Sequence, residues 1–391
     1  MSTAPFVRSS WVGDPYSCLI LSLVPLVHAQ WPARQLDSFF PAWDSYLHGL
    51  IAGTWPHDPD INCTSVLEAD LQADEWAPYK TVECLLDAFP EYRKSEMGVS
   101  AVALGLLPTI LSLLGPSITD QAILAMRRPF LPFLLAAGSP AVNPQLRHKY
   151  TKSIKKRLPS KQAVNRPDRS FWSSREGIFL VSLIEHVAAF GAVLNITILA
   201  YQLSVFTITS FSVRFGYLPA VWAGLSPLVH LGSYLALRLR VCVRRPGRER
   251  VSNEQGGRKR RNNLFSSFAE SCAAEFTPCE YQQLMTLEWC SEDKLRFKFG
   301  SVIAWLLNFG IVVHIFGTLT LSVLLFISAA DSIAIVARFV ASTVVTQLVY
   351  TYELSGIKKT TFLIDSVSTS RRGTSDVHRE RSELELIHHA R

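Results

Sequence analysis

Five long apolar runs constrain this 391-residue chain more than any other feature of its sequence. An α-helix needs about 20 mainly apolar residues to cross the hydrocarbon core of a membrane. The runs reach or approach that length, and they cover residues 98–115, 178–204, 217–238, 300–327 and 331–352. We therefore predict an all-α membrane protein with about five transmembrane helices.

The composition supports this fold class. Apolar residues make up 48% of the chain and charged residues 18%, against roughly 25% charged in soluble globular proteins. The mean hydropathy is +0.19 although several stretches are basic and polar. These values exclude a disordered chain and a small disulfide-rich protein, and they argue against a simple nucleic-acid-binding module.

The first apolar run, residues 18–29, is too short to cross a membrane. Its length suits the apolar part of a signal peptide, and Val27 and Ala29 are small residues at the −3 and −1 positions of a cleavage site. We predict that residues 1–29 are a signal peptide cleaved after Ala29. The alternative is an uncleaved segment at the membrane interface.

Residues 30–97 form an acidic, aromatic region with twelve acidic and four basic side chains. They include Cys63, Cys84 and the glycosylation sequon at Asn62. We predict an extracytoplasmic region in which a Cys63–Cys84 disulfide adds about 3 kcal/mol of stability. The alternative is two free thiols and an unused sequon.

The basic residues predict the orientation. Three segments, 116–177, 239–299 and 353–391, hold 12, 13 and 7 of the 39 Lys and Arg residues when Arg238 at the edge of its span is included. The positive-inside rule places such segments in the cytoplasm. We therefore expect two basic cytoplasmic loops and a cytoplasmic tail that is disordered, with the N-terminal region outside.

One apolar stretch in the first loop allows two interpretations. Residues 117–138 carry a helix-start signal and helical spacing, and we expect a helix lying on the membrane face or dipping into it. A sixth crossing is the rival interpretation, but it would move at least ten basic residues outside. In the second loop, residues 264–297 predict a short amphipathic helix on the inner face. The connections 205–216 and 328–330 predict tight hairpins.

The basic loops suggest that the protein binds lipid headgroups and does not bind nucleic acid. Residues 258–261 read RKRR, which beside a membrane span favours attraction to anionic lipid headgroups, about 1 kcal/mol per residue. A role in topology alone is an equal alternative. The bilayer is thus the one partner that the pattern predicts directly.

No pattern in the sequence predicts catalysis. Cys242, Cys272, Cys279 and Cys290 lack the spacing of a structural zinc site. The sequence also lacks the motifs of phosphate-binding loops, dinucleotide-binding folds, serine hydrolases and zinc metalloproteases. We therefore expect no enzyme activity, no cofactor and no metal.

Polar residues inside the spans are the candidate functional set. Glu185, His230 and Asn308 are expected at one depth, and His314 and Arg338 nearer the midplane. Because ionisable groups in a membrane face the bundle interior and pair there, we predict a Glu185–His230 contact with Asn308 nearby. We expect Arg338 to meet His314 or a backbone carbonyl. These residues serve either a proton or substrate pathway, or interhelical hydrogen bonding.

Residues 124–142, LAMRRPFLPFLLAAGSPAV, follow a span that contains a proline. This motif and the overall layout resemble uncharacterised multi-pass integral membrane proteins of filamentous fungi. The resemblance implies membrane residence and supplies no activity or site residues.

The sequence as a whole favours a non-enzymatic binding or scaffold protein of the secretory pathway, at the plasma membrane. The alternative is a channel or transporter that uses the intramembrane polar set.

Overall fold

The computed structural model describes most of the chain between residues 38 and 364. The described ranges are 38–52, 54, 63–72, 79–143, 174–210, 215–244, 273–290, 295–317 and 319–364. The predicted signal peptide, the sequon at Asn62, the RKRR segment, Cys272 and the C-terminal tail lie outside these residues.

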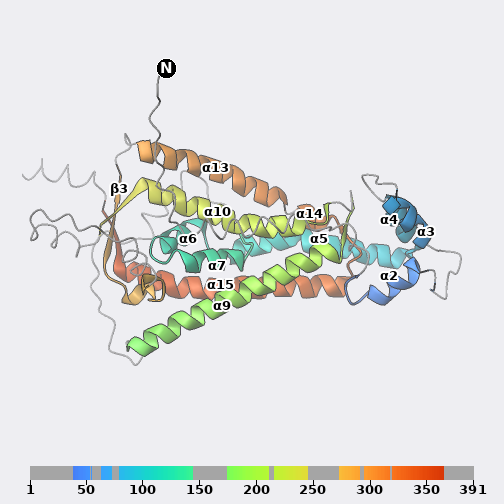
Figure 1. The fold of residues 1–391 in the computed structure, drawn as a ribbon, viewed down its shortest axis with the longest axis horizontal. Helices are drawn as coiled ribbons and strands as arrows, with labels where there is room; N and C mark the ends of the chain where they lie inside the picture. Colours follow the sequence, from blue (N-terminus) through green and yellow to red (C-terminus); the bar gives the residue numbers. More distant parts are fainter. Residues whose placement is uncertain are drawn as a thin grey trace, which may run out of the picture.

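The described chain is mainly helical, and five of its helical segments are long and apolar enough to cross a membrane. They run along the long axis of the molecule (Figure 1). Large apolar side chains such as Phe190, Phe309 and Leu348 stay exposed on them, which suggests a protein embedded in a membrane. The segments are α5 (Glu91–Leu114), α9 (Arg175–Val205), α10 (Leu218–Arg240), α13 (Leu295–Gly317) with α14 (Leu319–Ser322), and α15 (Ala329–Thr360).

The ends of these helices follow local capping rules. Ser174 and Ser328 accept hydrogen bonds from the first turns of α9 and α15, and Glu96 on α5 accepts one from the Ala329 N–H. The expected continuation of the fourth span to residue 327 is wrong. The chain there forms β4 (Leu324–Leu325), which pairs with β1 (Ile208–Thr209) before α15 begins.

Between α5 and α9, the single helix expected over 117–138, on the membrane face or dipping into it, is replaced by a buried hairpin of two short helices, residues 117–143. It contains α6 (Ile118–Ala125) and α7 (Phe130–Ala137), which lie between α10 and α15 (Figure 1). Every residue of α6 is buried, and Ser117 pairs with Asn143 where the hairpin begins and ends. Pro116 lacks the N–H that would continue α5, so the chain breaks there and restarts at the Ser117 cap.

A three-stranded sheet closes one end of the bundle, here called the sheet end. Its order is β2 (Val241–Arg244), β3 (Met285–Trp289), β5 (Thr361–Ile364), antiparallel and then parallel. β2 continues directly from α10 and β5 from α15. The sequence predicts an amphipathic helix over 264–297, and this prediction is wrong. The described part of this segment includes a short 3₁₀ turn, η5 (Cys279–Tyr281), and the strand β3.

The opposite end, here called the α2–α4 end, holds three short helices: α2 (Asp44–Ile51), α3 (Thr64–Gln72) and α4 (Tyr79–Ala88). The predicted Cys63–Cys84 disulfide is confirmed, and it joins the start of α3 to α4. Trp43 and Tyr46 pack edge-to-face on Phe89. Figure 1 shows this unit at the end of the bundle remote from β3.

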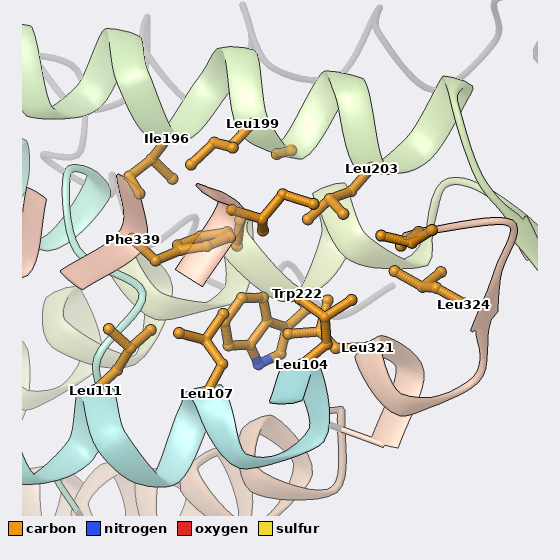
Figure 2. Packing of buried hydrophobic residues seen from close by; sticks show 14 of the residues in the cluster. Leu104, Leu107, Leu111, Ile196, Leu199, Leu203, Trp222, Leu321, Leu324 and Phe339 are labelled. Atoms are coloured by element: carbon orange, nitrogen blue, oxygen red, sulfur yellow. The ribbon is translucent and has the colours of Figure 1, made fainter. Parts of the chain in front are cut away.

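The apolar core between the long helices gathers around Trp222. Leucines from α5 and α9 and Phe339 from α15 surround its ring (Figure 2). The Trp222 indole also stacks on the His314 imidazole, with ring centroids 5.4 Å apart. This packing joins α5, α9, α10 and α15 beside the buried hairpin.

Candidate functional site

The most buried charged group among the described residues is Arg128, in the connection between α6 and α7. Its Nη1 atom lies 2.5 Å from Glu185 Oε2 on α9 and 2.8 Å from Glu353 Oε1 on α15. Its Nη2 atom donates to Ser182 Oγ at 2.9 Å. The guanidinium is completely buried, so these partners must offset the free-energy cost of removing its charge from water.

The two carboxyl groups around Arg128 have different surroundings. Glu353 also accepts a hydrogen bond from the Cys279 backbone N–H, at 3.1 Å on Oε2. Glu185 Oε1 is buried and has no hydrogen-bond partner in the described part of the chain. This group of side chains, here called the Arg128 cluster, joins the hairpin, α9, α15 and η5.

Arg127 and Glu275 fasten the same connection to the sheet end. Arg127 donates to Thr361 Oγ1 at 2.9 Å, to the Gln283 carbonyl at 2.8 Å and to the Thr360 carbonyl. The carboxylate of Glu275 accepts the N–H groups of Phe130 and Leu131 at the start of α7. A carboxylate there is favoured, since the first N–H groups of a helix have no partner within it.

At the other end of the hairpin, two histidines meet its unwound backbone. His314 Nε2 lies 3.1 Å from the Pro140 carbonyl oxygen, and His230 Nε2 lies 3.4 Å from that of Ala141. Each contact makes Nε2 the donor, so Nδ1 is the acceptor nitrogen of both rings, and among the described residues neither Nδ1 has a partner.

Three hydroxyl groups complete this contact. Ser226 Oγ on α10 lies 3.4 Å from the carbonyl oxygen of Ala136 and 3.3 Å from that of Ser139. The Ser139 and Thr343 hydroxyls are 3.0 Å apart. Non-helical backbone inside a bundle needs such donors, because no water surrounds it there.

A third polar contact lies between α9 and α15. Arg338 Nε donates to Asn195 Oδ1 at 3.0 Å, and its Nη1 donates to Gln202 Oε1 at 2.8 Å. Asn195 and Gln202 are seven residues apart, so they lie on one face of α9, two turns from each other. This contact involves no histidine.

The five predicted polar residues therefore do not form one cluster: Glu185 and Arg338 lie in different contacts, and His230 and His314 meet the hairpin. The expected Glu185–His230 pair is wrong, because Glu185 binds Arg128 and His230 meets the hairpin. The expected Arg338–His314 contact is replaced by the amides of α9. Asn308 is half-buried and makes no side-chain hydrogen bond within the described ranges.

Sequence reasoning missed several residues of these contacts: Arg128, Glu353, Asn195 and Gln202. The sequence places Arg128 in the basic segment 116–177 and Glu353 at the first position of the predicted tail, 353–391. The Arg-Arg pair beside Pro129 was the available signal, but its partners are 57 and 225 residues away.

The sheet end also holds a second disulfide, which the sequence did not predict. Cys242 on β2 is bonded to Cys290 just after β3. Cys279 is a free, buried thiol; burial raises the pKa of this thiol well above its ordinary value, and the Glu353 carboxyl group beside it acts in the same direction. The two disulfides thus lie at opposite ends of the bundle.

Within the part of the chain that the structure describes, no three His, Cys, Asp or Glu side chains are placed to hold a metal ion. A scan against models of protein families finds no match, and neither a search of curated proteins nor a search of solved structures finds a similar protein.

Proposed function

We propose that this protein is a non-enzymatic integral membrane protein that binds or scaffolds a partner. One observation carries the proposal: the polar side chains of the long helices bond to the buried hairpin or to each other in separate contacts. Such contacts hold a bundle together, and they offer no shared site for a substrate. The exposed units at the two ends are then the places for recognition.

The α2–α4 end is the partner-binding region in this proposal. Its disulfide and its aromatic core give a small rigid unit, and the Arg93 guanidinium lies 3.7 Å from the centre of the Tyr46 ring. Rigid surfaces lose little conformational entropy on binding, which favours recognition.

The environment of the protein is part of the same proposal. The chain enters the secretory pathway through its signal peptide and resides in the plasma membrane, with the α2–α4 end outside and glycosylated at Asn62. The sheet end and its basic segments face the cytoplasm and anionic lipid headgroups. The resemblance to integral membrane proteins of filamentous fungi supports membrane residence.

Site-specific photocrosslinking in cells tests partner binding. A photoreactive residue in place of exposed Glu68 on α3 should give a discrete protein adduct. The same residue in place of Phe190, which faces outward from α9, is the matched control and should label lipid. If the two positions give the same adducts, or Glu68 gives none, the binding proposal fails.

A channel or transporter is the second candidate, favoured by buried polar atoms of Glu185, His230 and His314 that have no partner among the described residues. The purified full-length protein in liposomes decides between the two. We expect proton, sodium, potassium and chloride fluxes equal to those of empty liposomes, with ionophores as positive controls. A flux that Glu185→Gln abolishes would establish transport instead.

A further inference from the structure

The Arg128 cluster brings two carboxyl groups onto one nitrogen atom. Glu185 Oε2 and Glu353 Oε1 both contact Arg128 Nη1, at 2.5 and 2.8 Å. Because both oxygens contact the same nitrogen atom, the two carboxyl groups lie close together. Two negative charges at that separation in a buried site repel strongly, as in carboxyl pairs that share one proton.

The hydrogen bonds distinguish the two carboxyl groups. Glu353 has a donor on each oxygen, Arg128 on Oε1 and the Cys279 N–H on Oε2, which suits an ionised carboxylate. Glu185 has a donor on Oε2 alone, while its buried Oε1 lacks one in the described structure. An oxygen without a donor suits the O–H of a carboxylic acid.

The neighbouring ionisable groups have their own contacts. Arg127 binds oxygens at the sheet end, and Glu275 caps α7 with His186 3.8 Å away. Other ionisable side chains on the elements packed around the cluster include Asp120, Cys279, Glu280, Tyr281, Tyr350, Tyr352 and Lys359. Glu280 pairs with Lys359, and Tyr350 donates to the Pro132 carbonyl. Among the described residues, the Arg128 guanidinium is thus the cation that contacts both carboxyl groups.

We propose that Glu185 and Glu353 bind one exchangeable proton between them, and that this proton locks the buried hairpin to α9, α15 and η5. A proton fits better than a metal ion. It needs one acceptor on each side, whereas Mg²⁺ or Ca²⁺ takes six or more oxygen ligands. The proposal goes beyond the proposed function and holds with or without a partner at the α2–α4 end.

Loss of this proton changes the charge of the cluster from neutral to negative. The negative charge on Glu185 then repels that on Glu353 in a buried site of low dielectric constant. The contact between the hairpin and the long helices therefore weakens. The Cys279 N–H ties the same carboxylate to the sheet end. Release of the proton is therefore expected to loosen the sheet end together with the hairpin.

Infrared spectroscopy of the full-length protein in lipid tests the site directly. We expect the C=O band of a buried carboxylic acid at neutral pH, shifted in D₂O and reduced as the pH is raised. Glu185→Gln should abolish the band. Glu91→Gln is the control, because that exposed side chain pairs with Lys94 at the surface and its loss should leave the band unchanged. A wild-type protein without such a band would overturn the proposal.

Two further measurements cover other outcomes. Sodium ions should leave the band unchanged at constant pH; if they displace it, a cation competes with the proton for the site, and the proton alone does not lock the hairpin. The midpoint of thermal unfolding should fall from neutral to alkaline pH in the wild type more than in Glu185→Gln, whose neutral amide replaces the acid. If the mutant does not fold, the wild-type band and its pH titration still decide the question.

Discussion

Arg338 on α15 and Asn195 on α9 bond to each other twice. Arg338 Nε donates to Asn195 Oδ1 at 3.0 Å, and Asn195 Nδ2 donates to the carbonyl oxygen of Arg338 at 3.1 Å. Asn195 also donates to Ser342 Oγ at 2.7 Å. A charged residue in a candidate span is thus held by neutral amides, and the contact joins the two longest helices of the described chain.

We expect Asn195→Leu to lower the free energy of unfolding by roughly 1–3 kcal/mol, because it leaves the Arg338 guanidinium and carbonyl with fewer partners. Asn308→Leu is the matched control, since Asn308 makes no side-chain hydrogen bond to another described residue, and it should change stability by less than about 0.5 kcal/mol. Unfolding in detergent micelles measures both. Equal losses would show that the Arg338 contact adds no stability.

The sequence could predict the elements of this contact but not the pairing. The apolar runs located α9 and α15, because hydropathy reports the length of a span directly. The partner of Arg338 lies 143 residues away, and its position depends on how two helices pack. The Cys63–Cys84 bridge was predictable because these are the two cysteines of an acidic region with its own sequon.

The buried hairpin shows the limit of charge counting. The positive-inside rule predicts that the segment holding Arg127 and Arg128 is cytoplasmic, but it says nothing about the partners of these residues. Their acceptors come from α9, α15 and the sheet end, which no local pattern connects to them. The Cys242–Cys290 bridge was missed for the same reason, because strands that follow different helices bring the two cysteines together.

Two glycines should respond oppositely to substitution by alanine. A Cβ atom at Gly356 on α15 would lie 2.5 Å from the Glu280 backbone nitrogen, so we expect Gly356→Ala to cost about 1–3 kcal/mol. At Gly191 on α9 a Cβ atom meets no described atom within 4 Å, and Gly191→Ala should add up to about 1 kcal/mol through helix propensity. Thermal unfolding of the two variants should give opposite shifts. Shifts of the same sign would contradict the packing of η5 against α15.

His314 should contribute to stability through its hydrogen bond more than through its ring. His314→Phe keeps a ring to stack on Trp222 but leaves the Pro140 carbonyl without this donor, and we expect a loss of roughly 1–3 kcal/mol. Hydrogen exchange should show faster amide exchange in the hairpin. His48→Phe, at an exposed position of α2, is the control and should leave hairpin exchange unchanged. Unchanged exchange in His314→Phe would exclude the proposed role of this histidine.

Cys279 should resist alkylation in the folded protein. Burial raises the pKa of its thiol, so the reactive thiolate forms at higher pH than in the unfolded chain. A raised pKa in the folded state means that this group stabilises the fold below the pKa of the unfolded thiol and stops doing so as the pH rises through the folded value. Iodoacetamide labelling followed by mass spectrometry should therefore modify Cys279 after denaturation and not before. Fast labelling of the native protein at neutral pH would contradict its burial.

The two disulfides should respond to reductants added on opposite sides of the membrane. They lie at opposite ends of the bundle, so a bilayer around the long helices separates them into different compartments. In the proposed orientation Cys63–Cys84 faces the oxidising exterior, where disulfides persist. The Cys242–Cys290 bridge then faces the reducing cytoplasm, which favours free thiols, so this second bridge argues against the proposed orientation and makes the orientation worth testing.

An impermeant phosphine added to intact cells, followed by an impermeant maleimide, should therefore label Cys63 and Cys84 and leave Cys242 and Cys290 unlabelled. In inside-out vesicles the same treatment should label Cys242 and Cys290 and leave Cys63 and Cys84 unlabelled. Each bridge is the internal control for the other, because both are in one molecule and meet the same reagents. Labelling of Cys242 and Cys290 from outside the cell would reverse the orientation, and labelling of both pairs from one side would show that the long helices do not separate the two ends.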